Sequence, residues 1–291
     1  MNHHALPTPA AALPKRGDSS IGGLLLESGK ITAENAERVL RMQKELGIRF
    51  GEAALRLGLI TEADIQHVLA QQFDYPYLLP GESTFSPRLV AAFDPFSPQV
   101  ETLRAVRSQL MLRWFTRGRK ALAVVAVDSG DGTSLFAANL AVVFSQLGEQ
   151  TLLVDANLRQ PHQQEIFDLK GRQGLSDVLA GRADLSVVTK VESFVDLSLL
   201  SSGTLPPNPQ ELLSRSSFSG LNAQLEARYD IVLYDTAAFA TAADALSIAG
   251  RVGGALIVVR KNKTHLDDVM TICDQITHAG AEVVGSVLVD F

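Results

Sequence analysis

The sequence predicts an α/β protein with a doubly wound, mostly parallel sheet, preceded by a small all-α domain built from helical hairpins. Three observations predict this fold. In the C-terminal two thirds of the chain, short apolar runs alternate with helical stretches; a glycine-punctuated turn joins the first run to a helix; and a helical repeat precedes them. Short, continuous, β-branched runs are typical of strands buried on both faces, and their alternation with helices implies parallel pairing through right-handed crossovers.

Six apolar runs are the predicted strands, and they lie at residues 121–127, 151–156, 195–200, 230–235, 255–259 and 283–289. In doubly wound sheets, ligands bind beyond the carboxyl ends of the strands. The residues that directly follow these runs are therefore the first candidates for a functional site.

An internal repeat precedes the predicted sheet, because residues 20–43 are echoed by residues 49–72. Each copy predicts a short amphipathic helix, a glycine stop, a threonine N-cap and a second helix. Thr61 and Asp64 are spaced like a capping box, with Asp in place of Glu. Two such hairpins are expected to pack on each other into one small domain.

Composition shifts along the chain predict its domain organisation. The start is rich in Pro and Ala and lacks the apolar core of a signal peptide, and a second Pro/Ser/Gly-rich stretch separates the repeat from the predicted sheet. The predicted parts are a disordered tail (1–19), an all-α domain (20–78), a linker (79–97) and the α/β domain (98–291).

Bulk composition restricts the classes of function. The 291 residues are 46% hydrophobic and 20% charged, which is ordinary for a globular protein, and the net charge of -6 argues against non-specific binding of nucleic acid. Cys273 is the single cysteine, so no intramolecular disulfide can form, and no apolar stretch approaches the roughly 18 residues needed to span a bilayer. We expect a cytoplasmic protein without a membrane span.

The turn after the first apolar run, in GDGTSLFAANLA, lies where a phosphate-binding loop belongs. Gly130 and Gly132 would let backbone N–H groups approach an anion, and the following helix adds the positive end of its dipole. Ser134 stands where a hydroxyl would bind Mg²⁺, but Thr133 replaces the lysine that reaches the β- and γ-phosphates, and Asp131 adds negative charge. The loop by itself is equally consistent with a nucleotide site and with a structural turn.

Two carboxylates strengthen the nucleotide hypothesis. Asp155 ends the second apolar run in LLVDANLR, and Asp235 ends the fourth in DIVLYD. Aspartates at strand ends beside a glycine loop are placed to hold Mg²⁺ or to accept a proton from an attacking hydroxyl, although each could instead cap the following helix. The catalytic candidates are Asp155, Asp235 and Arg159, and the metal candidates are Ser134, Asp155 and Asp235.

Residues 98–291 resemble the bacterial tyrosine kinases (BY-kinases), P-loop kinases that control capsule and exopolysaccharide chain length. The resemblance rests on GDGTSLFAANLA, LLVDANLRQP, IVLYDTAA and GTLPPNPQELL, and on Glu101, Arg104 and Arg107, whose spacing matches the helix that mediates ring assembly in that family. It implies a P-loop NTPase-like fold, ATP or ADP with Mg²⁺ as cofactors, and tyrosine autokinase activity. It also implies ring-type self-association and a membrane chain-length-determinant partner that recruits the protein to the inner membrane.

Several positions depart from the family pattern. Thr133 replaces the loop lysine, Asn157 replaces the second carboxylate of an Asp-x-Asp pair, and Ala237 and Ala238 replace two prolines. The family's C-terminal tyrosine cluster is missing, because the four tyrosines are Tyr75, Tyr77, Tyr229 and Tyr234.

These departures leave two hypotheses open. The protein is either an autokinase with relaxed motifs or a pseudokinase, meaning a nucleotide-binding or structural subunit of the polysaccharide machinery. Arg159 and Lys261 are the candidates that would supply the charge missing at Thr133.

The helical repeat resembles the N-terminal domain of type II secretion and pilus-assembly ATPases. In some of those proteins a tandem motif of this spacing binds cyclic di-GMP, which here would bias the C-terminal domain. The second copy keeps the leading arginine of the motif, and the first has Ser20 in its place. The candidates are Gly22, Gly29, Arg49, Gly51 and Gly58; the alternative is that the glycines only build the hairpins.

Overall fold

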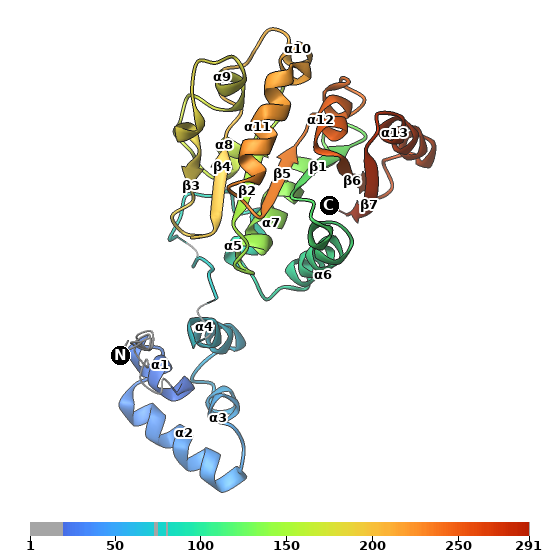
Figure 1. The fold of residues 1–291 in the computed structure, drawn as a ribbon. Coiled ribbons are helices and arrows are strands. Elements are labelled where there is room, and N and C mark those ends of the chain that lie inside the picture. The colour runs from blue at the N-terminus through green and yellow to red at the C-terminus, as the bar shows by residue number, and fades with distance from the viewer. Residues whose placement is uncertain (1–19, 73–74, 80, 291) are drawn as a thin grey trace, which may run out of the picture. The chain divides into compact units, whose positions relative to one another are not determined.

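The structure, a computed structural model, describes residues 20–72, 75–79 and 81–290, so the predicted tail at 1–19 lies outside the described residues. The chain divides into two compact units, with the boundary between Tyr75 and Pro76 (Figure 1). Within the described parts of the chain, no helix has both the length and the apolar character that a bilayer crossing requires.

The first unit consists of four helices in two hairpins, as the repeat predicts: α1 (Ile21–Glu27), α2 (Ala33–Leu46), α3 (Phe50–Arg56) and α4 (Glu62–Gln72). The Thr32 hydroxyl accepts the Asn35 N–H at 3.3 Å and so caps α2. Before α4, the Thr61 hydroxyl accepts the Asp64 N–H at 3.3 Å and the Asp64 carboxylate accepts the Thr61 N–H at 2.9 Å. This reciprocal pair is the capping box expected from the sequence.

Buried apolar side chains and one ion pair hold the two hairpins together. Leu25 and Val39 from the first copy pack with Ala53 and Val68 from the second in one core. Lys30, in the turn after α1, lies 2.8 Å from the Asp64 carboxylate, and this ammonium lowers the pKa of Asp64 to about 2. The two copies therefore form one packed domain.

The second unit is a seven-stranded sheet with helices on both faces (Figure 1). The strands are β1 (Ala121–Ala126), β2 (Thr151–Asp155), β3 (Thr189–Lys190), β4 (Leu197–Leu200), β5 (Ile231–Asp235), β6 (Gly254–Arg260) and β7 (Glu282–Val289). Their order is β3-β4-β2-β5-β1-β6-β7, and all pairs are parallel except β3 with β4. The predicted α/β fold is confirmed, and the six predicted runs all form strands.

Alternating strand residues feed two hydrophobic cores, one on each face of the sheet. On β1, Leu122 and Val124 face the first core, whereas Ala123 and Val125 face the second. The first core is covered by α5 (Val90–Phe93), α6 (Pro98–Arg113), α7 (Thr133–Ser145) and α8 (Gln163–Ile166). The second is covered by α9 (Leu175–Leu179), α10 (Pro209–Ser214), α11 (Ser216–Glu226), α12 (Asp244–Val252) and α13 (Leu266–His278). Short 3-10 turns lie at Phe115–Arg117 and Leu185–Val187.

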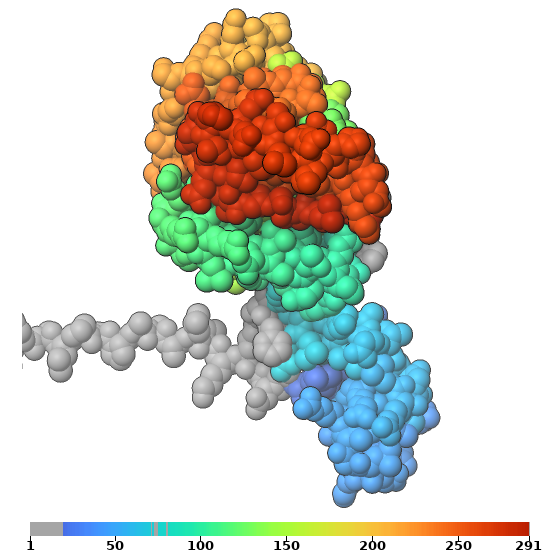
Figure 2. Space-filling model, turned by 90° about the vertical axis from the view of Figure 1, so that its right-hand side faces the viewer, coloured from blue at the N-terminus to red at the C-terminus, as the bar shows by residue number. Residues whose placement is uncertain are grey.

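The candidate site lies at the centre of the sheet, away from both edge strands. The two-residue β3 forms one edge and β7 the other; Figure 2 shows the red C-terminal segments that cover the β7 side of the unit. Strands β1, β2 and β5 are consecutive in the middle of the sheet, so their carboxyl ends lie next to one another. The phosphate-loop candidate follows β1, and the two candidate aspartates are the last residues of β2 and β5.

The segment predicted to be a linker differs from that expectation. Leu89, Ala91 and Ala92 are fully buried in the core that α7 covers, and the Ser86 N–H donates to the Ile166 carbonyl oxygen at 2.8 Å. The Pro/Ser/Gly-rich composition predicts an irregular backbone, but it does not reveal that the apolar LVAAF stretch must be buried. Residues 84–97 therefore belong to the α/β unit.

Candidate nucleotide-binding site

The loop between β1 and α7 has the backbone shape of a phosphate cradle. Gly130 and Gly132 adopt φ angles of +83° and +78°, a region in which any side chain would be strained. Helix α7 begins at Thr133, so the first N–H groups of the helix are available to an anion together with the positive end of the helix dipole. The loop thus keeps its anion-binding geometry although Thr133 has replaced the lysine.

Contrary to our expectation, the negative charge of Asp131 is not directed at the proposed phosphates. Its side chain is 1% exposed, and its carboxylate accepts the Asp128 N–H at 3.0 Å and lies 3.6 Å from the Lys263 ammonium. Lys263 also donates to the Ser129 carbonyl oxygen at 3.3 Å. The charge of Asp131 is therefore paired behind the loop by the turn that follows β6.

Asp155 and Asp235 lie opposite each other on the neighbouring strands β2 and β5, and both are fully buried. Burial, and then the charge of Asp235, raises the pKa of Asp155 well above its usual range, and burial raises the pKa of Asp235 to about 6. Two buried carboxylates on facing residues cannot both stay ionised unless a cation binds between them. The pair therefore either retains a proton near neutral pH or binds a metal ion.

Gln163 completes this pair, and sequence reasoning missed it. Its Nε2 donates to Asp235 Oδ2 at 2.8 Å and to the Ser134 carbonyl oxygen at 2.9 Å, so it joins α7 to the end of β5. Gln163 Oε1 and Asp235 Oδ1 are buried without a hydrogen-bond partner in the described chain. Unpartnered oxygens beside a second carboxylate fit Mg²⁺, which prefers oxygen ligands. Nothing in the sequence marks Gln163, since it lies in a short segment without periodicity.

A cavity of about 680 Å³ opens beside these residues, within the size range of small-molecule sites. Gly130, Gly132, Thr133 and Ser134 line it from the loop, and Asn157 lines it from the end of β2. Further lining residues are Gln160, His162 and Glu165 before and within α8, and Thr236 and Ala238 after β5. The structure therefore brings four of the five predicted loop residues into one cavity.

The predicted linker supplies an unexpected wall of this cavity, residues 84–88. Phe85 packs edge-on against Phe167 with ring centroids 5.5 Å apart, and the Thr84 hydroxyl donates to Asp168 at 2.6 Å. The buried LVAAF stretch that follows was the signal that could have placed this segment on the sheet. Residues 84–88 line the cavity together with residues at the start of α7 and in α8.

The two cations expected to replace the loop lysine are engaged elsewhere. Arg159 binds the buried Asp244 carboxylate through Nε at 2.6 Å and Nη2 at 3.2 Å, and so ties the loop after β2 to α12. Lys261 lies 2.7 Å from the Asp290 carboxylate. Because each charge already has a carboxylate partner, neither cation is held ready for a phosphate. The structure therefore gives both cations partners of their own, and their roles beside the phosphates stay predictions.

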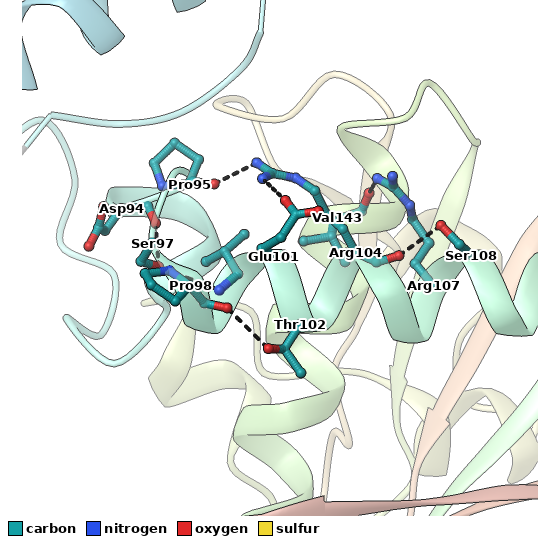
Figure 3. A network of polar contacts seen from close by, with 11 residues as sticks. Asp94, Pro95, Ser97, Pro98, Glu101, Thr102, Arg104, Arg107, Ser108 and Val143 are labelled. Carbon is teal, nitrogen blue, oxygen red and sulfur yellow. Dashed lines mark hydrogen bonds and ion pairs between the residues drawn. The ribbon is translucent and has the colours of Figure 1, made fainter.

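The predicted assembly residues lie on α6, and Figure 3 shows where they point. Arg104 contacts the Glu101 carboxylate at 2.9 Å and the Pro95 carbonyl oxygen at 2.5 Å, and Arg107 donates to the Val143 carbonyl oxygen of α7 at 2.7 Å. Both arginines thus fasten α6 within the chain, whereas the Glu101 side chain is 72% exposed. The ring-assembly role of this helix stays a prediction.

Four candidate residues for cyclic di-GMP have structural roles of their own. Gly29 and Gly58 end the turns after α1 and α3 with φ angles of +68° and +65°. A Cβ at Gly22 would lie 3.1 Å from the Phe50 ring, and one at Gly51 would lie 3.1 Å from Ile65. The cyclic di-GMP hypothesis therefore rests on the repeat spacing and on Arg49, which is exposed just before α3.

The strand order, the loop after β1 and the aspartates that end β2 and β5 define the α/β unit as a domain with the P-loop NTPase fold. The fold is shared with MinD from Pyrococcus horikoshii, solved with Mg-ADP, which is 23% identical with a TM-score of 0.52. No family model matches the chain.

Known proteins narrow this class further. CapB from Staphylococcus aureus, named as a tyrosine-protein kinase, is 33% identical over 207 residues, which are 71% of this chain and 90% of CapB. Tyrosine-protein kinase YwqD from Bacillus subtilis is 30% identical over 69% of this chain and 84% of its own length, whereas Wzc from Salmonella typhi, at 32% identity, is matched over only 28% of its length. The chain belongs to the bacterial tyrosine-protein kinase family.

Solved structures of similar proteins support the same family assignment. The chimerical protein CapA2B2 is 32% identical with a TM-score of 0.66, covering 79% of this chain and 98% of the chimera. The kinase domain of Escherichia coli ETK is 26% identical with a TM-score of 0.68, covering 75% of this chain and 86% of that domain. The resemblance stated from the sequence motifs is confirmed.

Proposed function

We propose that the α/β unit binds Mg-ATP in this cavity and that the protein regulates the chain length and export of an exopolysaccharide or capsule. One observation carries the proposal: the phosphate loop lines a cavity of about 680 Å³ together with Asn157 and Thr236, which come directly after the buried, facing pair Asp155 and Asp235. The polysaccharide role is supported by relatives, one of which is named for the cps region of Klebsiella pneumoniae.

Each part of the nucleotide has a candidate partner in the chain. The N–H groups at the start of α7 would hold the phosphates, and Ser134, Asp155 and Asp235 would hold Mg²⁺. The bound ion would neutralise charge on the phosphates and on the buried carboxylates. Phe85 supplies an apolar ring in the cavity wall.

A non-catalytic subunit is the second candidate function, and two residues favour it. Thr133 and Asn157 are neutral where the family has a lysine and a carboxylate. Phosphoryl transfer depends on positioning and charge neutralisation, and loss of one such group typically costs about 10²–10³ in rate. We therefore infer that the wild-type protein binds ATP but transfers its γ-phosphate slowly.

Restoring the loop lysine separates the two candidates. Thr133→Lys should tighten Mg-ATP binding in calorimetry by roughly tenfold or more, because it adds a cation at the phosphates. It should also raise γ-phosphate transfer by about 10²-fold, measured with labelled ATP. Rapid transfer by the wild-type protein would contradict the non-catalytic alternative, and an absence of ATP binding by both proteins would overturn the nucleotide site.

The partners are proposed on the same basis. A membrane chain-length-determinant protein would recruit the chain to the inner membrane. The similarity to the chimera CapA2B2, whose name joins CapA to CapB, supports a partner of this kind. Self-association through α6 is the second proposed contact. Binding of cyclic di-GMP to the first unit stays a prediction, which loss of binding in Arg49→Ala would support and unchanged binding would contradict.

A further inference from the structure

We propose that Arg88 supplies the positive charge that the phosphate loop lacks at Thr133, by binding the β- or γ-phosphate of the nucleotide. The proposal rests on the nucleotide site proposed above and names a residue that sequence motifs did not mark. Arg88 comes from the segment before α5, far from the loop in sequence, and lines the same cavity as Thr133 and Ser134.

The charge balance of the cavity points to Arg88. Among the described residues that line the cavity, Arg88 alone carries a permanent positive charge, whereas Asp128 and Glu165 are carboxylates. Three other cations near the loop already have partners: Lys263 and Arg260 bond the back of the loop at Asp131 and at the Gly130 carbonyl oxygen, and Arg159 bonds Asp244. None of the three lines the cavity. A polyphosphate in this cavity would therefore meet one guanidinium of this chain before any other fixed cation.

Asn139 holds Arg88 beside the loop. Its Nδ2 donates to the Arg88 carbonyl oxygen at 3.3 Å and to the Leu135 carbonyl oxygen at 2.9 Å, while its Oδ1 accepts the Ala91 N–H at 2.9 Å. Because one nitrogen bonds both carbonyl oxygens, the backbone of Arg88 lies against the first turn of α7. Leu135 directly follows Ser134, so the long arginine side chain starts within one helical turn of the phosphate cradle.

The Arg88 side chain is also free to act. It is exposed, and no ion pair joins it to another residue in the described ranges. A guanidinium binds phosphate oxygens in a bidentate manner and stays charged at all physiological pH values. P-loop enzymes use arginines from a second segment in this way, and here the charge would come from the same chain.

The test is calorimetric titration of the full chain with ATP and with AMP, both with Mg²⁺. Arg88→Ala should weaken ATP binding by roughly ten- to fifty-fold, because hydrogen bonds to charged groups are lost. AMP binding should stay unchanged, since AMP lacks the two outer phosphates, and Arg88→Lys should retain part of the ATP affinity. The matched control is Arg228→Ala, which removes an exposed arginine just before β5, at the end of the strand away from the cavity.

The Thr133→Lys background tests whether the two charges replace each other. There, Arg88→Ala should cost less than about threefold in ATP affinity, because the loop lysine now meets the phosphates. Unchanged ATP affinity in Arg88→Ala, in a protein whose wild type binds ATP, would overturn the role of Arg88 and leave the nucleotide site standing.

Other outcomes are equally decisive. Equal losses of AMP and ATP affinity in Arg88→Ala would show that Arg88 only shapes the cavity, which overturns the phosphate contact. ATP binding by Thr133→Lys but not by the wild type would show that Arg88 does not replace the lysine. If neither protein binds ATP, the proposed function itself fails.

Discussion

At the scale of single residues, the buried pair Asp155 and Asp235 carries the largest electrostatic cost in the site. Asp155 accepts the N–H groups of Asn157, His162 and Gln163, which partly offset its burial. Asp235 receives the Gln163 amide but keeps one oxygen without a partner in the described structure. Carboxylates whose pKa values are shifted by burial and by a second charge cluster at functional sites, and a bound metal ion would offset the like charges here.

This pair should make the metal-free protein less stable as the pH rises. The pKa of Asp235 is about 6 in the folded state and about 4 in the unfolded chain, so the folded state holds a proton that the unfolded state has lost between these values. The contribution of Asp235 to the free energy of unfolding is therefore greatest below about pH 4. It is lost as the pH rises through about 6, and the loss from Asp235 alone is roughly 3 kcal/mol. The raised pKa of Asp155 acts in the same direction.

Thermal unfolding in a chelator at about pH 4.5 and pH 7.5 measures this effect, and the comparison between variants isolates it. Asp235→Asn should reduce the loss of stability between the two pH values, whereas Asp230→Asn, an exposed aspartate just before the same strand, should leave it as in the wild type. Addition of Mg²⁺ should stabilise the wild type at the higher pH. An Asp235→Asn protein with the full wild-type pH dependence would contradict the assignment.

At the scale of elements, the notable contact joins α7 to the segment before the sheet. Asn139 lies 4% exposed on α7 and satisfies the backbone at Arg88 and at Ala91. Its apolar neighbours Leu89 and Ala92 are fully buried in the same core. Asn139 thus joins α7 to a cavity wall that has no ladder of backbone hydrogen bonds to a strand.

Asn139→Ala should loosen this wall without unfolding the sheet. The substitution leaves the Ala91 N–H and the Arg88 carbonyl group without their partner, which should cost about 2 kcal/mol. Hydrogen exchange in residues 84–93 should become faster. The control is Asn222→Ala, which removes a buried α11 asparagine whose Oδ1 accepts the hydroxyl of Tyr234 on β5, and it should leave exchange in 84–93 unchanged. Equal exchange in Asn139→Ala and the wild type would show that α7 does not hold the segment.

At the scale of the whole molecule, self-association depends on what α6 leaves exposed. Arg104 and Arg107 already contact backbone oxygens of Pro95 and Val143, so substituting either one would disturb the fold as well as an interface. Glu101 is the member of the motif whose side chain is mostly exposed. It is therefore the cleaner probe of assembly.

Glu101→Lys should shift the protein toward monomer in sedimentation velocity, with a melting temperature close to that of the wild type. The expected cause is repulsion between the new ammonium and basic groups on a neighbouring copy. Thr102→Ala, an exposed neighbour on the same helix, serves as the control. A Glu101→Lys protein that sediments as the wild type does would rule out Glu101 as an assembly contact.

Prediction from sequence succeeded where a residue pattern is dictated by backbone geometry. Five of the six apolar runs form strands that are mostly buried, and the sixth forms the partly exposed edge strand β7. Gly130 and Gly132 stand where φ is positive. β3 escaped prediction because it has two exposed residues and no apolar pattern. The cavity wall at 84–88 escaped it because its position depends on contacts with distant helices.

The sequence by itself therefore determined the sheet, the loop after β1 and the meeting of Asp155 with Asp235, since these follow from periodicity and from parallel strands ending at one edge. Only the tertiary structure decided how the charges pair. It placed Asp131 against Lys263, Arg159 against Asp244 and Arg88 in the cavity. Such pairs join residues far apart in the chain, and their choice depends on distance and burial, which leave no periodic mark in the order of the residues.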